Sequence, residues 1–245
     1  ALRYDNMTLR MTDNQLTIES GLVSRFTCRL AREKTTVLTI KRNPLEKIAG
    51  CQTISLQQAE NATDSKNEGG IRIYGSNLGD ELLAWWLGNN GSVNDTTLLS
   101  AASGIGLMMR RFIPHLLLAA GGAAIIMIST KLALAAVMAG AVYAAIAAVR
   151  AAMAWKHSSI ELKESYMKIN RGNIACIREY IRYRNIQSVA IASTPFTPYT
   201  GRVSINVSTN AGCATVSSLA MNEALAIRNY ILDGKVSLSA SESVV

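Results

Sequence analysis

The chain has 245 residues, is 49% hydrophobic and carries a formal net charge of +8. The positive charge is spread along the chain without a basic tail, which argues against a nucleic-acid partner and favours weak attraction to anionic lipid. Four scattered cysteines and two histidines lack the spacing of a zinc site, and we expect all four cysteines to be reduced and buried.

Residues 1–88 have the pattern of a small β-rich domain. Short runs have the pattern of strands: residues 15–21 and 51–59 alternate between polar and apolar residues. Residues 15–21 end at a glycine and residues 37–44 end at a proline, as strands do at turns and edges. A helix is expected to follow, with Asn77 as its N-cap and Gly88 just past its end. Antiparallel strands followed by one helix predict a small barrel or bent sheet closed by that helix.

Residues 89–111 are predicted to form a juxtamembrane linker. Its second part, residues 96–111, contains apolar positions that would suit a helix lying in a membrane interface. The same stretch contains two glycines and two serines, which suit a loop. The sequence leaves both alternatives open.

Residues 112–155 are predicted to form a transmembrane hairpin with spans at 112–130 and 132–155. Each run is long enough to cross a bilayer core, which needs roughly 20 apolar residues. The alternative is a helical hairpin buried in a soluble core, but the flanking segments are too small to enclose two such helices. Arg110, Arg111 and Arg150 lie at the outer ends, so the positive-inside rule places both flanking domains in the cytoplasm.

Small residues recur every fourth position along the second span, and this spacing predicts close packing between helices in lipid: Ala136, Gly140, Ala144, Ala148 and Ala152. Gly121 and Gly122 are the corresponding small residues of the first span. Neither span contains an acidic residue, which argues against an ion pathway through this hairpin alone.

Residues 156–235 repeat the pattern of the first domain, and residues 236–245 are predicted to be a tail. At a shift of 151 residues, Gly50 falls on Gly201 and Pro44 falls on Pro195, without a gap from residue 13 to 59. Beyond that stretch the shift is 143 residues, which indicates a longer loop in the first copy. In the second copy the closing helix is expected to bury one apolar side: Met221, Ala224, Leu225, Ile231 and Leu232.

The second copy, with "IRYRNIQSVAIASTPFTPYTGRVSINVSTNAG" at residues 181–212, resembles the bacterial PH-domain family of membrane proteins, of the YdbS/YdbT-like type. The first copy, with "QLTIESGLVSR", matches more loosely. The resemblance implies a β + α membrane protein with two PH-like β-barrel domains, each of seven strands closed by a C-terminal helix. The transmembrane hairpin would separate these domains. It also implies longer relatives with further transmembrane pairs, so we expect this chain to be a segment of a longer protein.

Three arginines are the candidate ligand-binding residues. Arg178, Arg182 and Arg184 alternate with Tyr180 in the sequence, so on one strand they would line one face and meet an anionic lipid or an acidic partner. The alternative is an ordinary solvated sheet face. A weaker basic set lies in the first copy: Arg29, Arg32, Lys34, Lys41, Arg42 and Lys47. Specific phosphoinositide binding is disfavoured, because few basic residues converge on the loop after the first strands.

Nothing in the sequence predicts an enzyme or a cofactor, since no phosphate loop, nucleophile motif or paired-acid pattern is present. We expect a non-enzymatic scaffold or binding module in the bacterial cytoplasmic membrane. The resemblance suggests roles in envelope stress or antimicrobial-peptide tolerance. Expected partners are membrane lipid and another membrane protein, such as a smaller PH-domain companion or a second copy of this chain, but not nucleic acid. A component of a transport or lipid-handling complex is the alternative; a pore-forming toxin is disfavoured by the paired β-domains.

Overall fold

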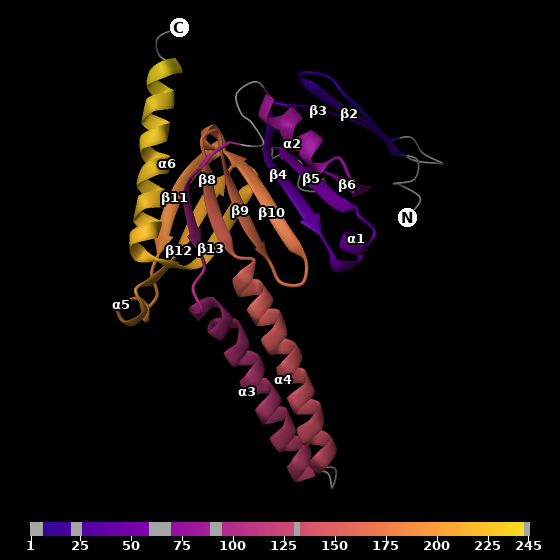
Figure 1. Cartoon of the computed structure of the whole chain (residues 1–245), viewed down its shortest axis with the longest axis vertical. Coiled ribbons are helices and arrows are strands. Elements are labelled where there is room, and N and C mark those ends of the chain that lie inside the picture. The colour runs from indigo at the N-terminus through magenta and orange to yellow at the C-terminus, as the bar shows by residue number, and fades with distance from the viewer. Residues whose placement is uncertain (1–6, 21–25, 59–69, 89–94, 130–132, 243–245) are drawn as a thin grey trace.

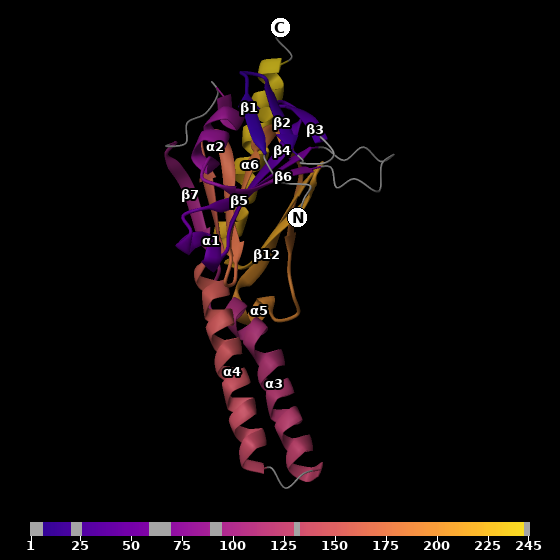
Figure 2. The same cartoon turned by 90° about the vertical axis from the view of Figure 1, so that its right-hand side faces the viewer.

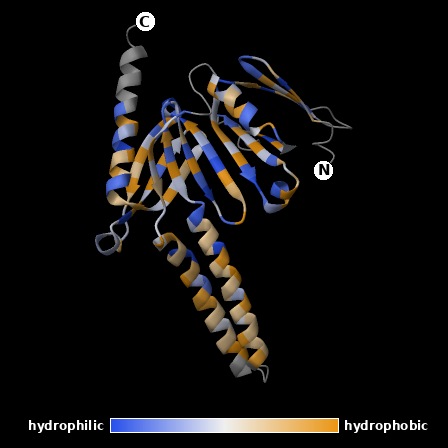
Figure 3. Cartoon of the chain, in the orientation of Figure 1, coloured by the Kyte–Doolittle hydropathy of each residue, from blue (hydrophilic) through white to orange (hydrophobic). Residues whose placement is uncertain are grey.

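The computed structural model describes residues 7–20, 26–58, 70–88, 95–129 and 133–242. It has a β-rich part, formed by two domains, and two long helices that project together from one end of it (Figures 1 and 2). Figure 3 shows that hydrophobic residues dominate the projecting helices, whereas polar and apolar residues alternate along the strands.

The first domain contains two three-stranded sets and two helices. Strands β1, β2 and β3 form one sheet, and β4, β5 and β6 pair in that sequence order. The bounds are Thr8–Met11 for β1, Gln15–Ser20 for β2, Phe26–Ala31 for β3, Thr35–Arg42 for β4, Gln52–Gln58 for β5 and Gly70–Ser76 for β6; the helices are α1, Pro44–Ile48, and α2, Gly79–Leu87.

The second domain contains seven strands and the helix α6 (Met221–Glu242). Strands β7 to β10 are neighbours in one sheet, and β11 to β13 form another. The bounds are Thr97–Ala102 for β7, Ser159–Lys163 for β8, Tyr166–Gly172 for β9, Cys176–Arg182 for β10, Ile186–Ala192 for β11, Arg202–Thr209 for β12 and Gly212–Ala220 for β13; the short helices are η3, Tyr183–Asn185, and α5, Thr197–Thr200. The two β-rich domains with closing helices expected from the sequence are therefore present, and the pairing of the described strands leaves their sheets open.

One sheet runs through both domains. Its strand order is β6-β5-β4-β10-β9-β8-β7, and antiparallel pairing of β4 with β10 places Leu38 opposite Tyr180. One core lies against the β4 to β6 part, under α2, and includes Leu38, Ile54 and Trp86. The other core includes Met167 and lies against the β8 to β10 part, under β11 to β13 and α6. The first domain thus contributes β4 to β6 to the shared sheet, and the second domain contributes β7 to β10.

The linker predicted at residues 89–111 is wrong in its second part. Thr97–Ala102 form β7, which pairs antiparallel with β8, so this segment is the first strand of the second domain. The hairpin is therefore inserted between two adjacent strands of that domain. Residues 97–102 are therefore neither the interfacial helix nor the loop that the sequence left open. They form a strand because the edge of β8 supplies hydrogen-bond partners for their backbone groups.

The two projecting helices are α3 (Gly106–Ser129) and α4 (Ala133–Lys156). Their segments 106–126 and 134–156 are long and apolar enough to cross a membrane, with mean hydropathies of 1.2 and 1.8. Their apolar side chains are mostly exposed, in contrast to those of the core helices of a soluble domain. This exposure argues against the buried-hairpin alternative. The first span begins six residues earlier than predicted, at Gly106.

The small-residue row of α4 is only partly at the contact with α3. Ala136 is buried, and a Cβ on Gly140 would lie 3.5 Å from Ala123. Farther along, Ala147 and Ala151 are buried instead of Ala148 and Ala152. A helix has 3.6 residues per turn, so positions spaced by four residues drift gradually around its surface. Towards the end of α4 the residues one position earlier therefore face α3. Gly121 and Gly122 are exposed.

Several local predictions are confirmed and others are wrong. Gly50 and Gly201 both follow a short helix and both have a positive φ, of 68° and 61°. Gly88 caps α2, but the N-cap is Leu78 rather than Asn77. No described cysteine is buried, and Cys213 is exposed on β13. The buried side of α6 consists of Ala224, Ile227 and Ile231, while Met221, Leu225 and Leu232 are exposed.

Hydrogen bonds fix the base of the hairpin to the second domain. Ser103, at the end of β7, is 4% exposed, and its Oγ lies 2.7 Å from both Ser158 Oγ and the Ser217 carbonyl oxygen. Trp155 Nε1 donates to the Ser103 carbonyl oxygen at 2.8 Å. Trp155 thus ties the end of α4 to the residue that follows β7, before α3.

Candidate binding site

The three predicted arginines do not form one exposed strip. Arg178 is exposed in the middle of β10, whereas Arg182 ends that strand and is only 9% exposed. Arg184 lies outside the strand, in η3, and is exposed. The prediction assumed a longer strand with a solvated face. The strand is shorter, and the first domain covers the face on which Tyr180 and Arg182 lie.

Arg182 and Arg184 instead meet Arg32, from the turn between β3 and β4, in a cavity of about 290 Å³ at the junction of the two domains. We call it the junction cavity. Segments far apart in the sequence supply its walls: Arg32, Glu33, Leu87, Glu164, Ser165, Arg182, Tyr183 and Arg184.

Arg182 is held by the core of the first domain. Its guanidinium carbon lies 4.4 Å from the centre of the Trp86 ring, a cation–π arrangement. Trp86 is fully buried, and its Nε1 donates to the Thr35 carbonyl oxygen at 3.1 Å. Nη2 of Arg182 is buried and has no hydrogen-bond partner among the described residues. A buried donor without an acceptor is costly, so this group is suited to an incoming anion.

Arg32 is packed against the end of α2. A Cβ on Gly88 would lie 2.6 Å from Arg32 Nη1, so glycine is needed there for the guanidinium to approach the backbone. The carbonyl end of a helix is favourable for a cation. This contact holds Arg32 at the cavity although its own turn is on the surface.

The cavity carries an excess of positive charge. Burial, together with the charges of Arg184 and Arg32, lowers the pKa of Arg182 to about 10, and Glu33 opposes this shift. In the described residues, no ion pair within 4.0 Å joins these three arginines to Glu33 or Glu164. Planar guanidinium groups bind carboxylate and phosphate through paired hydrogen bonds. The cavity is therefore suited to an acidic group.

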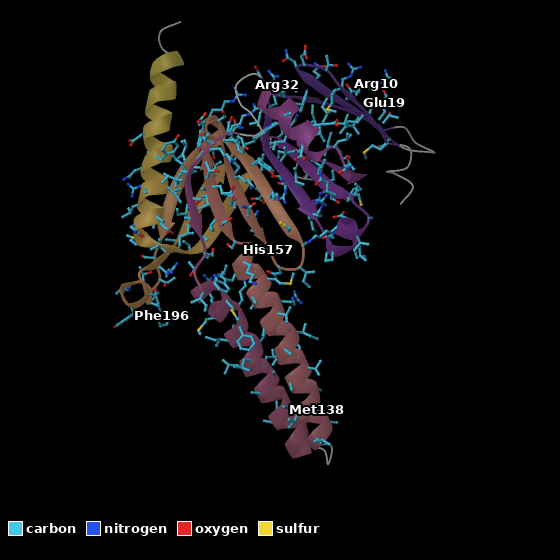
Figure 4. All side chains as sticks on the ribbon, in the orientation of Figure 1. Arg10, Glu19, Arg32, Met138, His157 and Phe196 are labelled. Atoms are coloured by element: carbon cyan, nitrogen blue, oxygen red, sulfur yellow. The ribbon has the colours of Figure 1, made fainter. Side chains whose placement is uncertain are left out.

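The cavity lies far from the projecting helices. Figure 4 shows Arg32 and Met138 at opposite ends of the molecule, with His157 between them. Along β10, Arg182 is six residues beyond Cys176, which corresponds to about 20 Å. The β9–β10 turn at the other end of the strand contacts the hairpin base, where His157 Nδ1 lies 3.3 Å from the Asn173 carbonyl oxygen. A bilayer around the hairpin would not reach the junction cavity.

Most of the basic residues noted in the first copy do not join this site. Of that set only Arg32 lines the cavity; Arg29, Lys34, Lys41, Arg42 and Lys47 do not. The alternation of charges in the sequence therefore identified Arg182 and Arg184 but not their surroundings. Trp86, the ring beneath Arg182, gave no signal beyond that of a core residue. Within the described ranges, no group of three or more His, Cys, Asp and Glu side chains could hold a metal ion.

Comparison with known proteins gives a family match over most of the chain. A family model described as "Bacterial PH domain" matches residues 1–88 and 112–235. These segments contain the strands of both domains apart from β7, and also most of the hairpin. No curated protein matches the chain.

Proposed function

The chain belongs to the bacterial PH domain family, and from this premise we propose that it is a non-enzymatic, membrane-anchored binding module. Its hairpin holds two joined β-rich domains beside the bilayer. Its junction cavity takes an acidic segment of another membrane protein. The observation that supports this most directly is the convergence of Arg32, Arg182 and Arg184 in one cavity, where within the described part of the chain no carboxylate lies within 4.0 Å of their nitrogens.

The location of the cavity favours a protein partner over bilayer lipid as its occupant. The cavity lies at the end of the β-rich part opposite the hairpin, where an adjacent membrane protein with its own domain could reach it. The sequence alone, which predicted the arginines on one solvated strand face, had left an anionic lipid and an acidic partner as equal alternatives. In the proposal, both domains are cytoplasmic and the membrane is the bacterial inner membrane, because basic residues are concentrated at the outer ends of both spans.

Finer aspects of the proposal come from the family resemblance and the internal repeat. We propose that the two domains are copies of one unit, as the positive-φ glycines at positions 50 and 201 support. A YdbS-like role in envelope stress or antimicrobial-peptide tolerance, with a smaller PH-domain companion as partner, is the corresponding biological setting. A component of a transport or lipid-handling complex is the second candidate, favoured by the exposed Gly121 and Gly122 in α3, where another helix could approach closely.

The test is co-purification of the full chain from membranes in mild detergent, with mass spectrometry of the proteins that remain bound. The variant is R182M/R184Q, which removes two of the converging charges while keeping an apolar side chain over Trp86. The matched control is R178Q/K41Q, which removes two exposed charges outside the cavity. Carbonate extraction reports membrane insertion separately.

We expect a stoichiometric membrane-protein partner with the wild type and the control, and a reduction of at least tenfold with R182M/R184Q. Equal recovery of the partner by the variant would overturn the assignment of the cavity. Retained lipid with no protein partner would favour the lipid-handling alternative. Complete extraction of the wild-type chain by carbonate would overturn the membrane anchor itself.

A further inference from the structure

A second cavity lies at the base of the hairpin, between α3, α4 and the β9–β10 turn. Its volume is about 260 Å³. We call it the hairpin-base cavity. Its polar lining consists of Arg110, Arg111, His115, Tyr143, Arg150 and Asn173. It shares no residue with the junction cavity.

The charge of this cavity is one-sided. Arg110, Arg111 and Arg150 are all exposed, and no carboxylate is among the residues that line it. Arg111 donates a hydrogen bond to Oδ1 of Asn173, which holds its guanidinium at the mouth. Three guanidinium groups around one opening are suited to an anion with several oxygens.

The depth of the arginines matches the edge of a bilayer. Arg111 is 18 residues before the end of α3 at Ser129, a helical rise of about 27 Å. Arg150 is 17 residues after the start of α4 at Ala133, a rise of about 26 Å. A hydrocarbon core is about 30 Å thick. The two arginines thus stand at the headgroup level of the leaflet that faces the β-rich domains.

The deeper wall combines one polar pair with apolar side chains. His115 Nδ1 lies 2.9 Å from the Tyr143 hydroxyl, a link between α3 and α4. Pro114 and Ile146 also line the cavity, and Ile146 is 56% exposed. An opening with cationic groups at its outer edge and apolar side chains on its inner side matches a phospholipid, whose phosphate precedes its acyl chains.

We propose that the hairpin-base cavity binds the phosphate group of an anionic phospholipid. This inference rests on the membrane insertion of the hairpin in the proposed function, but not on any protein partner. Basic pockets between membrane helices on the cytoplasmic side are a known way to hold such headgroups. A free phosphate ion offers the same chemistry without the acyl chains, and the experiment separates the two sources.

The experiment uses the full chain, purified in mild detergent, delipidated, and titrated with phosphatidylglycerol or phosphatidylcholine under native mass spectrometry. The main variant is R110Q/R111Q/R150Q. The matched control, R10Q/K41Q/R178Q, removes the same charge from exposed positions outside both cavities. The single variant R150Q leaves α3 unchanged, and thermal unfolding of every variant reports whether it is folded.

We expect the wild type and the control to bind phosphatidylglycerol at least tenfold more tightly than phosphatidylcholine. Each arginine near a headgroup contributes roughly a fivefold factor, so the triple variant should lose about 100-fold and R150Q about fivefold. A folded R150Q and a folded triple variant that both bind like the wild type would overturn the proposal.

Inorganic phosphate is the second probe. We expect millimolar phosphate to leave bound phosphatidylglycerol in place, because it lacks the apolar contacts. Equal binding of the two lipids by the wild type, together with arginine-dependent binding of inorganic phosphate, would overturn the lipid assignment and identify a soluble phosphate. Either result is independent of the co-purification test, since no partner protein is present.

Discussion

The guanidinium carbon of Arg182 lies 4.4 Å from the centre of the Trp86 ring, although the two residues belong to different domains. Trp86 is in α2, at the end of the first domain, and Arg182 ends β10 of the second. A second link is close by, where Asn185 Nδ2 donates to the Thr36 carbonyl oxygen at 3.0 Å. Together with the pairing of β4 and β10, these contacts join the two domains, so the junction cavity exists only when both domains are present and packed together.

Replacing Arg182 with methionine should leave the protein as stable as the wild type, or up to about 2 kcal/mol more stable. The change removes a buried charge with an unpartnered Nη2 and keeps an apolar contact with Trp86, which offsets the lost cation–π energy. Denaturant unfolding in detergent measures this. K41M, at an exposed position of the neighbouring strand β4, should change stability by less than about 0.5 kcal/mol. A loss above 2 kcal/mol in R182M would contradict the account.

Alkaline pH should destabilise the fold through buried tyrosines. Burial raises the pKa of Tyr166 from 10.0 to about 12, helped by the negative charges of neighbouring groups. Between pH 10 and 12 the Tyr166 hydroxyl therefore keeps its proton in the folded state, whereas it has lost the proton in the unfolded state. This contribution to stability is fully present below pH 10 and is lost between pH 10 and 12, by up to about 3 kcal/mol for Tyr166.

The measurement is thermal unfolding across that pH range for the wild type and for Tyr166→Phe, which should show a shallower decline. Arg182 acts in the opposite direction, because its pKa falls from 12.5 to about 10 on folding. Its burial penalty is present below pH 10 and is relieved above it. The R182M variant should therefore lose stability more steeply than the wild type. Parallel curves for all three proteins would show that neither group titrates as described.

Two glycines should differ sharply in their tolerance of alanine. Gly201 has φ of 61° but open space around its Cβ position, so Gly201→Ala should cost about 1 kcal/mol from the backbone alone. Gly172 has φ of 133°, and its Cβ would lie 1.9 Å from the Ala175 carbonyl oxygen. Gly172→Ala should therefore cost at least about 3 kcal/mol. Thermal unfolding ranks the two variants, and equal losses would contradict the β9–β10 turn geometry.

Ser103→Ala should weaken the base of the hairpin. The buried hydroxyl contacts Ser158 Oγ and the Ser217 carbonyl oxygen, so its removal leaves both groups short of a partner and should cost about 1–3 kcal/mol. Ser100→Ala, at an exposed position of the preceding strand β7, is the control and should be nearly neutral. Differential scanning fluorimetry in detergent compares them. A neutral Ser103→Ala would show that the hairpin is held by other contacts.

The sequence by itself determined the local elements of this protein. Alternating residues placed β2, β5, β9 and β12, because the period of a strand is short and its turns are marked by glycine and proline. Two long apolar runs located α3 and α4, because each is long enough for a helix to cross a membrane with its backbone hydrogen bonds satisfied internally. The recurrence of glycine at positions 50 and 201 reflects a turn in which a positive φ is needed in both domains.

Only the tertiary structure decided how these elements meet. β4 pairs with β10, and β7 pairs with β8, although long segments of chain separate the two strands of each pair. Local periodicity predicts a strand but not which other strand will pair with its edge. The burial of Arg182, and its separation from Arg178, follow from that pairing, because the first domain covers Tyr180 and Arg182 whereas Arg178 stays exposed. The two cavities are formed by residues from distant segments, so their charge depends on long-range packing that no single stretch of sequence contains.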